Sequence, residues 1–287
     1  EMCIRDRDLR YMTESGTIKF DRLRVLPCSC PVCSKYGLEE LREMPREELE
    51  RLIAMHNLYA LKNEIDRVKQ AIREGSLWEL LEQRAQAHPK MMDALARLSE
   101  SIELLEKYHP ITRQPVSGLF FKSDTSLWRP EVYRHSKRMR ERYEPPEADL
   151  LLMLPETDEK PYTRYGPVSR LLSEARERGE RLHVVVYSPV FGIVPVELSE
   201  VFPLSQYSLS RYLRRDPEER ALRGVVEYIA RYRGKYERAI VVVDRELVDL
   251  DVSALEREVR GLGARVELVE VSLSSADLKE ILRAASA

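Results

Sequence analysis

The segment Cys28-Ser29-Cys30-Pro31-Val32-Cys33, with His56 following after 22 intervening residues, decides how the first part of this chain folds. The three thiols are too crowded to pair comfortably as disulfides, yet they are well placed to converge on one tetrahedral ion. Zinc accepts three thiolates and one imidazole as a complete set of ligands. A complete set leaves no position for water or substrate. The spacing therefore predicts a structural zinc ion held by Cys28, Cys30, Cys33 and His56.

The residues around the cluster favour this prediction. Pro27 and Pro31 suit a loop that turns tightly and presents ligands. A helix is expected from about Pro45, with His56 on its apolar face. That face is formed by Leu49, Leu52, Ile53, His56 and Ala60. A loop packed against this helix would meet the imidazole.

Two other interpretations of these residues remain open. A histidine on an apolar face is often only a hydrogen-bonded core residue, and clustered thiols in a reducing compartment can be redox-active. The fourth cysteine, Cys3, leaves little material for a disulfide framework. The remaining histidines lie farther away in sequence and lack a ligand-like spacing: His88, His109, His135 and His183.

Length and composition set the broad class of the protein. The chain has 287 residues, of which 43% are hydrophobic and 33% charged, with a net charge of −2. This length has room for two domains. The balanced charge provides no global basic field, so any RNA contact must be local. No apolar run is long enough to span a membrane and no signal peptide is present, so we expect a cytoplasmic protein that does not contact membranes.

The first seven residues, Glu1-Met2-Cys3-Ile4-Arg5-Asp6-Arg7, resemble a translated sequencing adapter. We therefore expect residues 1–7 not to belong to the natural protein, and its sequence upstream of Asp8 to be missing.

The rest of the chain divides into a helical part and an alternating part. Residues 38–107 are strongly helical in pattern, and Pro145-Pro146 forms a stiff linker. Beyond it, strand-like runs alternate with helical segments of ten to fifteen residues, which predicts a mostly parallel sheet. The expected division is 8–118, 119–147 and 148–287, with strands near 150–154, 183–187, 239–243 and 266–271.

Several segments of this sequence resemble the archaeal tRNA-guanine transglycosylases. The most specific are the cysteine segment, extended to Pro27-Cys28-Ser29-Cys30-Pro31-Val32-Cys33-Ser34-Lys35-Tyr36, and His56-Asn57-Leu58-Tyr59. The similarity continues at 67–75, 78–80, 88–90, 129–132, 165–168 and 201–207. The resemblance implies the tail of a TIM-like barrel with a helical zinc-binding appendage (8–118), a connecting segment (119–147) and an α/β accessory domain (148–287).

The resemblance also implies an activity for the parent protein. Such an enzyme replaces a guanine in the D-arm of tRNA with 7-cyano-7-deazaguanine, and it uses two aspartates, one as nucleophile and one as general acid/base. Both would lie upstream of this chain, because Asp21 and Asp66 match no catalytic motif. We therefore expect no catalytic residue here and no activity from the chain alone. The resemblance further implies a homodimer.

Residues 129–142 predict a local RNA contact. Arg134, Lys137 and Arg138 fall on one face of an expected helix, where they could bind tRNA phosphates. The alternative is a solvated helix, partly neutralised by the glutamates nearby.

Two other functions stay open. An archaeosine synthase would amidate the installed base, but the family carries a further cysteine motif in its C-terminal region, whereas every cysteine here lies at or before position 33. The second is a non-catalytic, zinc-stabilised subunit that docks tRNA for a barrel encoded elsewhere.

Overall fold

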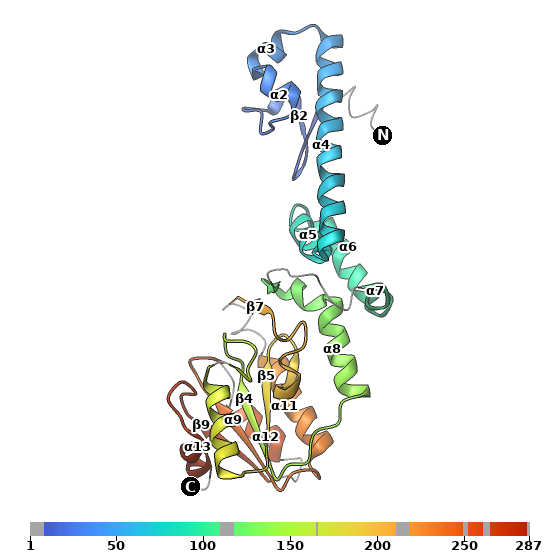
Figure 1. Ribbon diagram of the computed structural model, residues 1–287. Coiled ribbons are helices and arrows are strands. Elements are labelled where there is room, and N and C mark those ends of the chain that lie inside the picture. Colours follow the sequence, from blue (N-terminus) through green and yellow to red (C-terminus); the bar gives the residue numbers. More distant parts are fainter. Residues whose placement is uncertain are drawn as a thin grey trace. The chain divides into compact units, whose positions relative to one another are not determined.

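A computed structural model describes residues 9–109, 118–164, 166–210, 218–248, 252–260 and 265–285 (Figure 1). The chain forms two compact units that meet between Leu98 and Ser99. The expectation about residues 1–7 lies outside the described part. The division at 118 and 147 stays a prediction.

Unit 1 packs a hairpin and two short helices against one long helix (Figure 1). The hairpin is antiparallel, and α4 ends at Gly75, whose φ of 71° is the left-handed conformation that glycine adopts easily. The core consists of Tyr11, Phe20, Leu23, Leu41, Leu49 and Ile53. The elements are β1 (Arg10–Thr13), β2 (Gly16–Lys19), η1 (Phe20–Arg22), α2 (Pro31–Lys35), α3 (Leu38–Glu43), α4 (Arg46–Glu74), α5 (Leu77–Ala85) and α6 (Pro89–Glu100), of which α6 continues past Leu98. The predicted helical pattern is confirmed.

Unit 2 is built on a five-stranded sheet with the order β6-β5-β4-β8-β9. All neighbouring pairs are parallel except β5 and β6. The predicted mostly parallel sheet is therefore confirmed, and β6 is an addition that the alternation did not reveal. The strands are β4 (Leu150–Pro155), β5 (Leu182–Ser188), β6 (Gly192–Pro195), β8 (Arg238–Val243) and β9 (Val266–Glu270).

Helices cover both faces of this sheet. Every residue of β4 is buried, and its alternate side chains enter two separate cores. Leu152 packs with residues of α9 and α13, whereas Met153 packs with residues of α11 and α12. This arrangement explains why β4 reads as a continuous apolar run rather than an alternating one. The helices are α9 (Gly166–Arg178), α11 (Glu218–Tyr232), α12 (Val252–Arg260) and α13 (Leu278–Ala284).

Unit 2 also contains a separate, smaller parallel pair of strands. Strand β3 (Leu119–Phe121) pairs with β7 (Tyr207–Leu209), and helix α8 (Pro130–Glu141) packs close to α7 (Ile102–Tyr108). The remaining elements are the 3-10 helices η2 (Asp124–Trp128) and η3 (Val196–Leu198). Strand β3 buries Leu119 and Phe121, whereas Phe120 between them is exposed.

Two further expectations meet the structure in part. Within the described residues the strands of unit 1 pair only with each other, so the TIM-like barrel stays a prediction. None of the described helices combines the length and apolar character that a membrane span requires.

Candidate metal centre and a buried ionic cluster

The four predicted ligands converge in unit 1. One ligand atom from each of Cys28, Cys30, Cys33 and His56 lies within 4.8 Å of all the others. Cys28 and Cys30 precede α2, Cys33 lies inside it, and His56 projects from α4. Pro31 occupies the first turn of α2, where its fixed φ turns the chain directly into the helix. The predicted meeting of loop and helix is therefore confirmed.

The imidazole of His56 faces the sulfurs with one particular nitrogen. Its Nδ1 lies 3.4 Å from Sγ of Cys30 and 3.5 Å from Sγ of Cys33. Its Nε2 lies 2.9 Å from the carbonyl oxygen of Met12, to which it donates. A proton on Nε2 leaves the Nδ1 lone pair directed at the sulfurs, which is the tautomer a metal ligand needs.

Strand β1 supports the centre through two side chains that the spacing argument missed, Tyr11 on the strand itself and Asn57 on α4. The Tyr11 ring stacks on His56 at 3.7 Å between centroids, and its hydroxyl lies 3.2 Å from Sγ of Cys33. Asn57 accepts from the backbone N–H of Met12 and donates to the carbonyl of Arg10, both at 2.9 Å. Asn57 is therefore a clamp that holds β1 against α4 beside the ligand.

The protonation chemistry of the cluster suits a cation. Burial, together with the neighbouring sulfurs of Cys30 and Cys28, raises the pKa of the Cys33 thiol to about 12, although the hydrogen bond with Tyr11 opposes them. Burial also lowers the pKa of His56, which keeps the imidazole neutral. Thiolates at this position therefore need a positive charge among them. A tetrahedral ion at ordinary Zn–S distances separates its sulfur ligands by roughly 3.8 Å, so the observed cluster fits such an ion.

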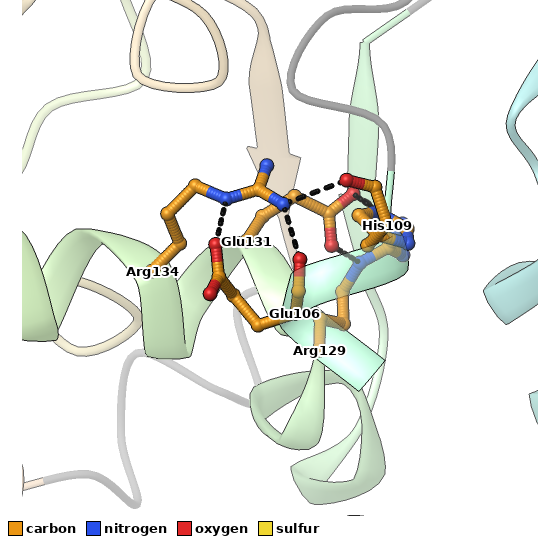
Figure 2. Close-up of polar contacts among 5 residues, drawn as sticks. All are labelled: Glu106, His109, Arg129, Glu131 and Arg134. Atoms are coloured by element: carbon orange, nitrogen blue, oxygen red, sulfur yellow. Dashed lines mark hydrogen bonds and ion pairs between the residues drawn. The ribbon is translucent and has the colours of Figure 1, made fainter. Parts of the chain in front are cut away.

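In unit 2, α8 does not present all three predicted RNA-binding residues to solvent. Arg134 is only 6% exposed, and its guanidinium donates to the Glu106 carboxylate at 2.7 Å. It also donates to the carbonyls of Glu106 and His109, at 3.1 and 2.8 Å, so it caps the C-terminal end of α7 (Figure 2). Lys137 is half-buried and Arg138 exposed. Arg134 thus serves the fold, and the RNA contact stays a prediction that Lys137 and Arg138 carry.

A buried carboxylate lies next to Arg134 on the same helix (Figure 2). Glu131 is 1% exposed and lies 3.1 Å from Nε2 of His109 and 3.4 Å from Nε of Arg129. Burial raises the pKa of the Glu131 carboxyl, but the hydrogen bond from His109 and the charge of Arg129 outweigh it and hold that pKa well below its usual range. The cluster joins the end of α7 to the start of α8.

Comparisons with known proteins match both units. The family model for queuine tRNA-ribosyltransferase matches residues 4–90, which include all four metal-ligand candidates. A model for a domain of unknown function, DUF5591, matches residues 132–280, which is more than half of the chain. Three archaeal proteins named tRNA-guanine(15) transglycosylase match across both regions.

The protein from Methanocaldococcus jannaschii is 40% identical over 207 residues, and the match covers 71% of this chain and 30% of that protein. The one from Pyrobaculum aerophilum is 42% identical over 202 residues, covering 70% and 39%. The one from Pyrococcus abyssi is 35% identical over 269 residues, covering 92% and 38%. The chain belongs to the archaeal tRNA-guanine transglycosylase family.

The chain matches only part of each of these transglycosylases. The chain spans well under half the length of these three proteins. The two family models together include the candidate metal centre of unit 1 and the sheet of unit 2, and the match to the Pyrococcus abyssi protein extends over 92% of the chain.

Replacing Asn57 with alanine tests the clamp on β1. Without the amide, Tyr11 and Met12 lose their fixed position beside His56. We expect Asn57→Ala to weaken the affinity for a divalent cation about 10- to 100-fold, as substitutions around metal ligands commonly do. Titration with Co²⁺, followed by absorption and chelator competition, measures it. Asn63→Ala, which changes an exposed residue two turns farther along the same helix, is the control and should leave affinity unchanged. Equal affinities in both variants would contradict the clamp.

Replacing Glu131 with glutamine tests the ionic cluster. The change leaves the charge of Arg129 buried without its partner, so the free energy of unfolding should fall by about 3 kcal/mol at pH 7. The pKa of Glu131 is lower in the folded than in the unfolded state. Its stabilisation is therefore fully present well above the unfolded pKa of about 4.3 and is lost progressively as the pH falls from there toward the much lower folded pKa.

Urea unfolding at pH 7 and at pH 4 measures both effects. The wild-type chain should lose more stability on acidification than Glu131→Gln does. Glu141→Gln, on the exposed side of α8, is the control and should behave like the wild type. The same acid sensitivity in Glu131→Gln and wild type would rule out this role for Glu131.

Proposed function

We propose that this chain is the C-terminal part of an enzyme that exchanges a D-arm guanine of tRNA for 7-cyano-7-deazaguanine. The observation that supports this most strongly is the coincidence of the Cys3His cluster with the region matched by the queuine tRNA-ribosyltransferase model. Three relatives that match over about 70% or more of this chain carry the name tRNA-guanine(15) transglycosylase. The catalytic aspartates belong to a TIM-like barrel encoded upstream, to which unit 1 is a helical appendage.

The ion of the metal centre is zinc in this proposal, one per chain. Three sulfurs and one nitrogen form a donor set that zinc accepts in closed structural sites. Bound there, zinc supplies the positive charge that holds the thiolates together and stabilises unit 1. The half-buried and buried ligands leave no role for it in base exchange.

The proposed partner is tRNA, contacted by Lys137 and Arg138 on α8. Arg134 supports this surface from behind by fixing α7. By family resemblance the chain forms a homodimer in the cytoplasm. A non-catalytic tRNA-docking subunit is the second candidate function, because none of the residues described here is assigned to catalysis.

Metal analysis of the purified chain tests the zinc proposal. We expect about one zinc ion per chain in the wild type and a loss of most of it in Cys30→Ser, because three ligands bind far more weakly than four. Ser29 lies between two of the ligands in the sequence, so Ser29→Ala is the control and should retain about one zinc ion per chain. A different metal in the wild type, or full zinc in Cys30→Ser, would contradict the proposed site.

A chimera tests the proposed activity. Joining the upstream part of the Methanocaldococcus jannaschii protein to residues 8–287 should give tRNA-dependent incorporation of labelled guanine or 7-cyano-7-deazaguanine, since that part supplies the expected aspartates. Residues 8–287 alone should incorporate none. Incorporation by the chain alone would overturn the proposed location of the active site. A folded chimera that binds tRNA without exchanging bases would favour the docking subunit.

A further inference from the structure

Unit 2 contains a cleft of about 640 Å³ between α8 and α11, beside the start of β6. No site described above uses this cleft. Its charged lining consists of Arg140 from α8, Arg220, Arg223, Glu227 and Arg231 from α11, and Asp124 from η2. Arginines outnumber carboxylates along its walls. The cleft is therefore a concentration of positive charge on a chain whose net charge is slightly negative.

Arg220 is the most informative of these residues. It is partly buried, and within the described part of the chain no carboxylate pairs with it. Burial and the charge of Arg223 lower the pKa of its guanidinium. A half-desolvated cation facing a like charge is destabilising unless an anion offsets it. The fold thus places Arg220 in a position that favours a negatively charged ligand.

The other arginines extend this charge along one helix face. Arg231 donates to the carbonyl of Arg140 at 2.7 Å and stacks on the Tyr232 ring at 5.1 Å, so contacts within unit 2 orient it. At 1.5 Å per residue, Arg220 and Arg231 lie about 16 Å apart along α11. This length exceeds a single phosphate group and suits a chain of them. Glu227 interrupts the row, and Asp124 lies at its edge, so the row is not uniformly basic.

One wall of the cleft also belongs to α8, the helix on which the proposed function places an RNA contact. Arg140 follows Lys137 and Arg138 on α8, within one turn of the helix. Arginine guanidinium groups bind phosphates and carboxylates alike with two parallel hydrogen bonds. The tRNA partner of the proposed function therefore favours a nucleic-acid backbone in this cleft over an acidic peptide.

We infer that the cleft between α8 and α11 binds successive phosphates of the tRNA backbone, with Arg220 and Arg223 as its principal contacts. This inference rests on the proposed function, because it takes tRNA as the partner. It adds a contact surface on α11, away from the α8 residues to which the proposed function assigns RNA binding.

Fluorescence anisotropy with a labelled tRNA transcript and the full 287-residue chain tests the inference. Arg220→Gln combined with Arg223→Gln should weaken binding at least about 10-fold. The slope of log affinity against log salt should become shallower by about 1 to 2, as expected when phosphate contacts are lost. Arg176→Gln combined with Arg178→Gln removes the same charge from the exposed side of α9, which packs on the other face of the sheet, and should change affinity less than 2-fold.

A second variant keeps the inference testable if the double variant misfolds. Arg140→Gln changes an exposed residue on the opposite wall and should weaken binding about 3-fold with unchanged thermal stability. Equal tRNA affinity in the cleft and control variants, or no tRNA binding by the wild-type chain, would overturn the inference. Two competition results would also overturn the inference. One is that polyglutamate displaces tRNA from the wild-type chain as readily as polyphosphate does. The other is that ATP saturates the cleft without weakening the binding of tRNA.

The base-exchange assay separates this inference from the proposed function. Normal exchange by the chimera, combined with unchanged tRNA affinity in the cleft variants, overturns the cleft alone. Loss of exchange in every chimera, combined with weakened tRNA binding in the cleft variants only, supports the cleft and contradicts the enzymatic proposal.

Discussion

The imidazole of His56 is the point where three separate segments of unit 1 meet. Its Nδ1 faces the sulfurs of the loop and α2, its Nε2 bonds to the backbone of β1, and its own backbone belongs to α4. The apolar core beneath it comprises six buried side chains. A core of that size stabilises a small unit only weakly, so the ion proposed for this cluster would crosslink loop, strand and helix and add stability that burial cannot supply. The orientation of the hairpin and of α2 depends on this contact.

The sequence predicted the ligands of this centre but not the residues that support it. Metal ligands must be of a few chemical types at a few spacings, so Cys28, Cys30, Cys33 and His56 could be recognised without a structure. Asn57 works through hydrogen bonds to the backbone of β1, and a backbone group has no signature in sequence. The sign of this role in the sequence is that Asn57, a polar residue, directly follows His56 on a helix whose His56 face is predicted to be buried.

The same contrast holds for the sheet. The strands β4, β5, β8 and β9 could be predicted because each is a β-branched or aliphatic run followed or preceded by a helical period. The pairing of β3 with β7 could not, because it joins three-residue segments separated by more than 80 positions. Such short strands are stabilised by the side chains packed around them, among them Phe191 against Phe121 and Tyr207, rather than by their own propensity.

The arginines show most clearly why the pattern of charges along the sequence does not by itself predict which side chains are exposed to bind RNA. The spacing of Arg134 with Lys137 and Arg138 suggested one exposed stripe, but helical spacing does not reveal what lies opposite each side chain. Arg134 faces the carbonyls at the end of α7 and the Glu106 carboxylate, which together compensate its charge in a buried position. Arg129 is compensated in the same way by Glu131. Arg220, by contrast, faces Arg223. Compensation within the chain therefore distinguishes Arg129 and Arg134, which stabilise the fold, from Arg220, for which we infer an anionic ligand, and only the packed structure supplies that distinction.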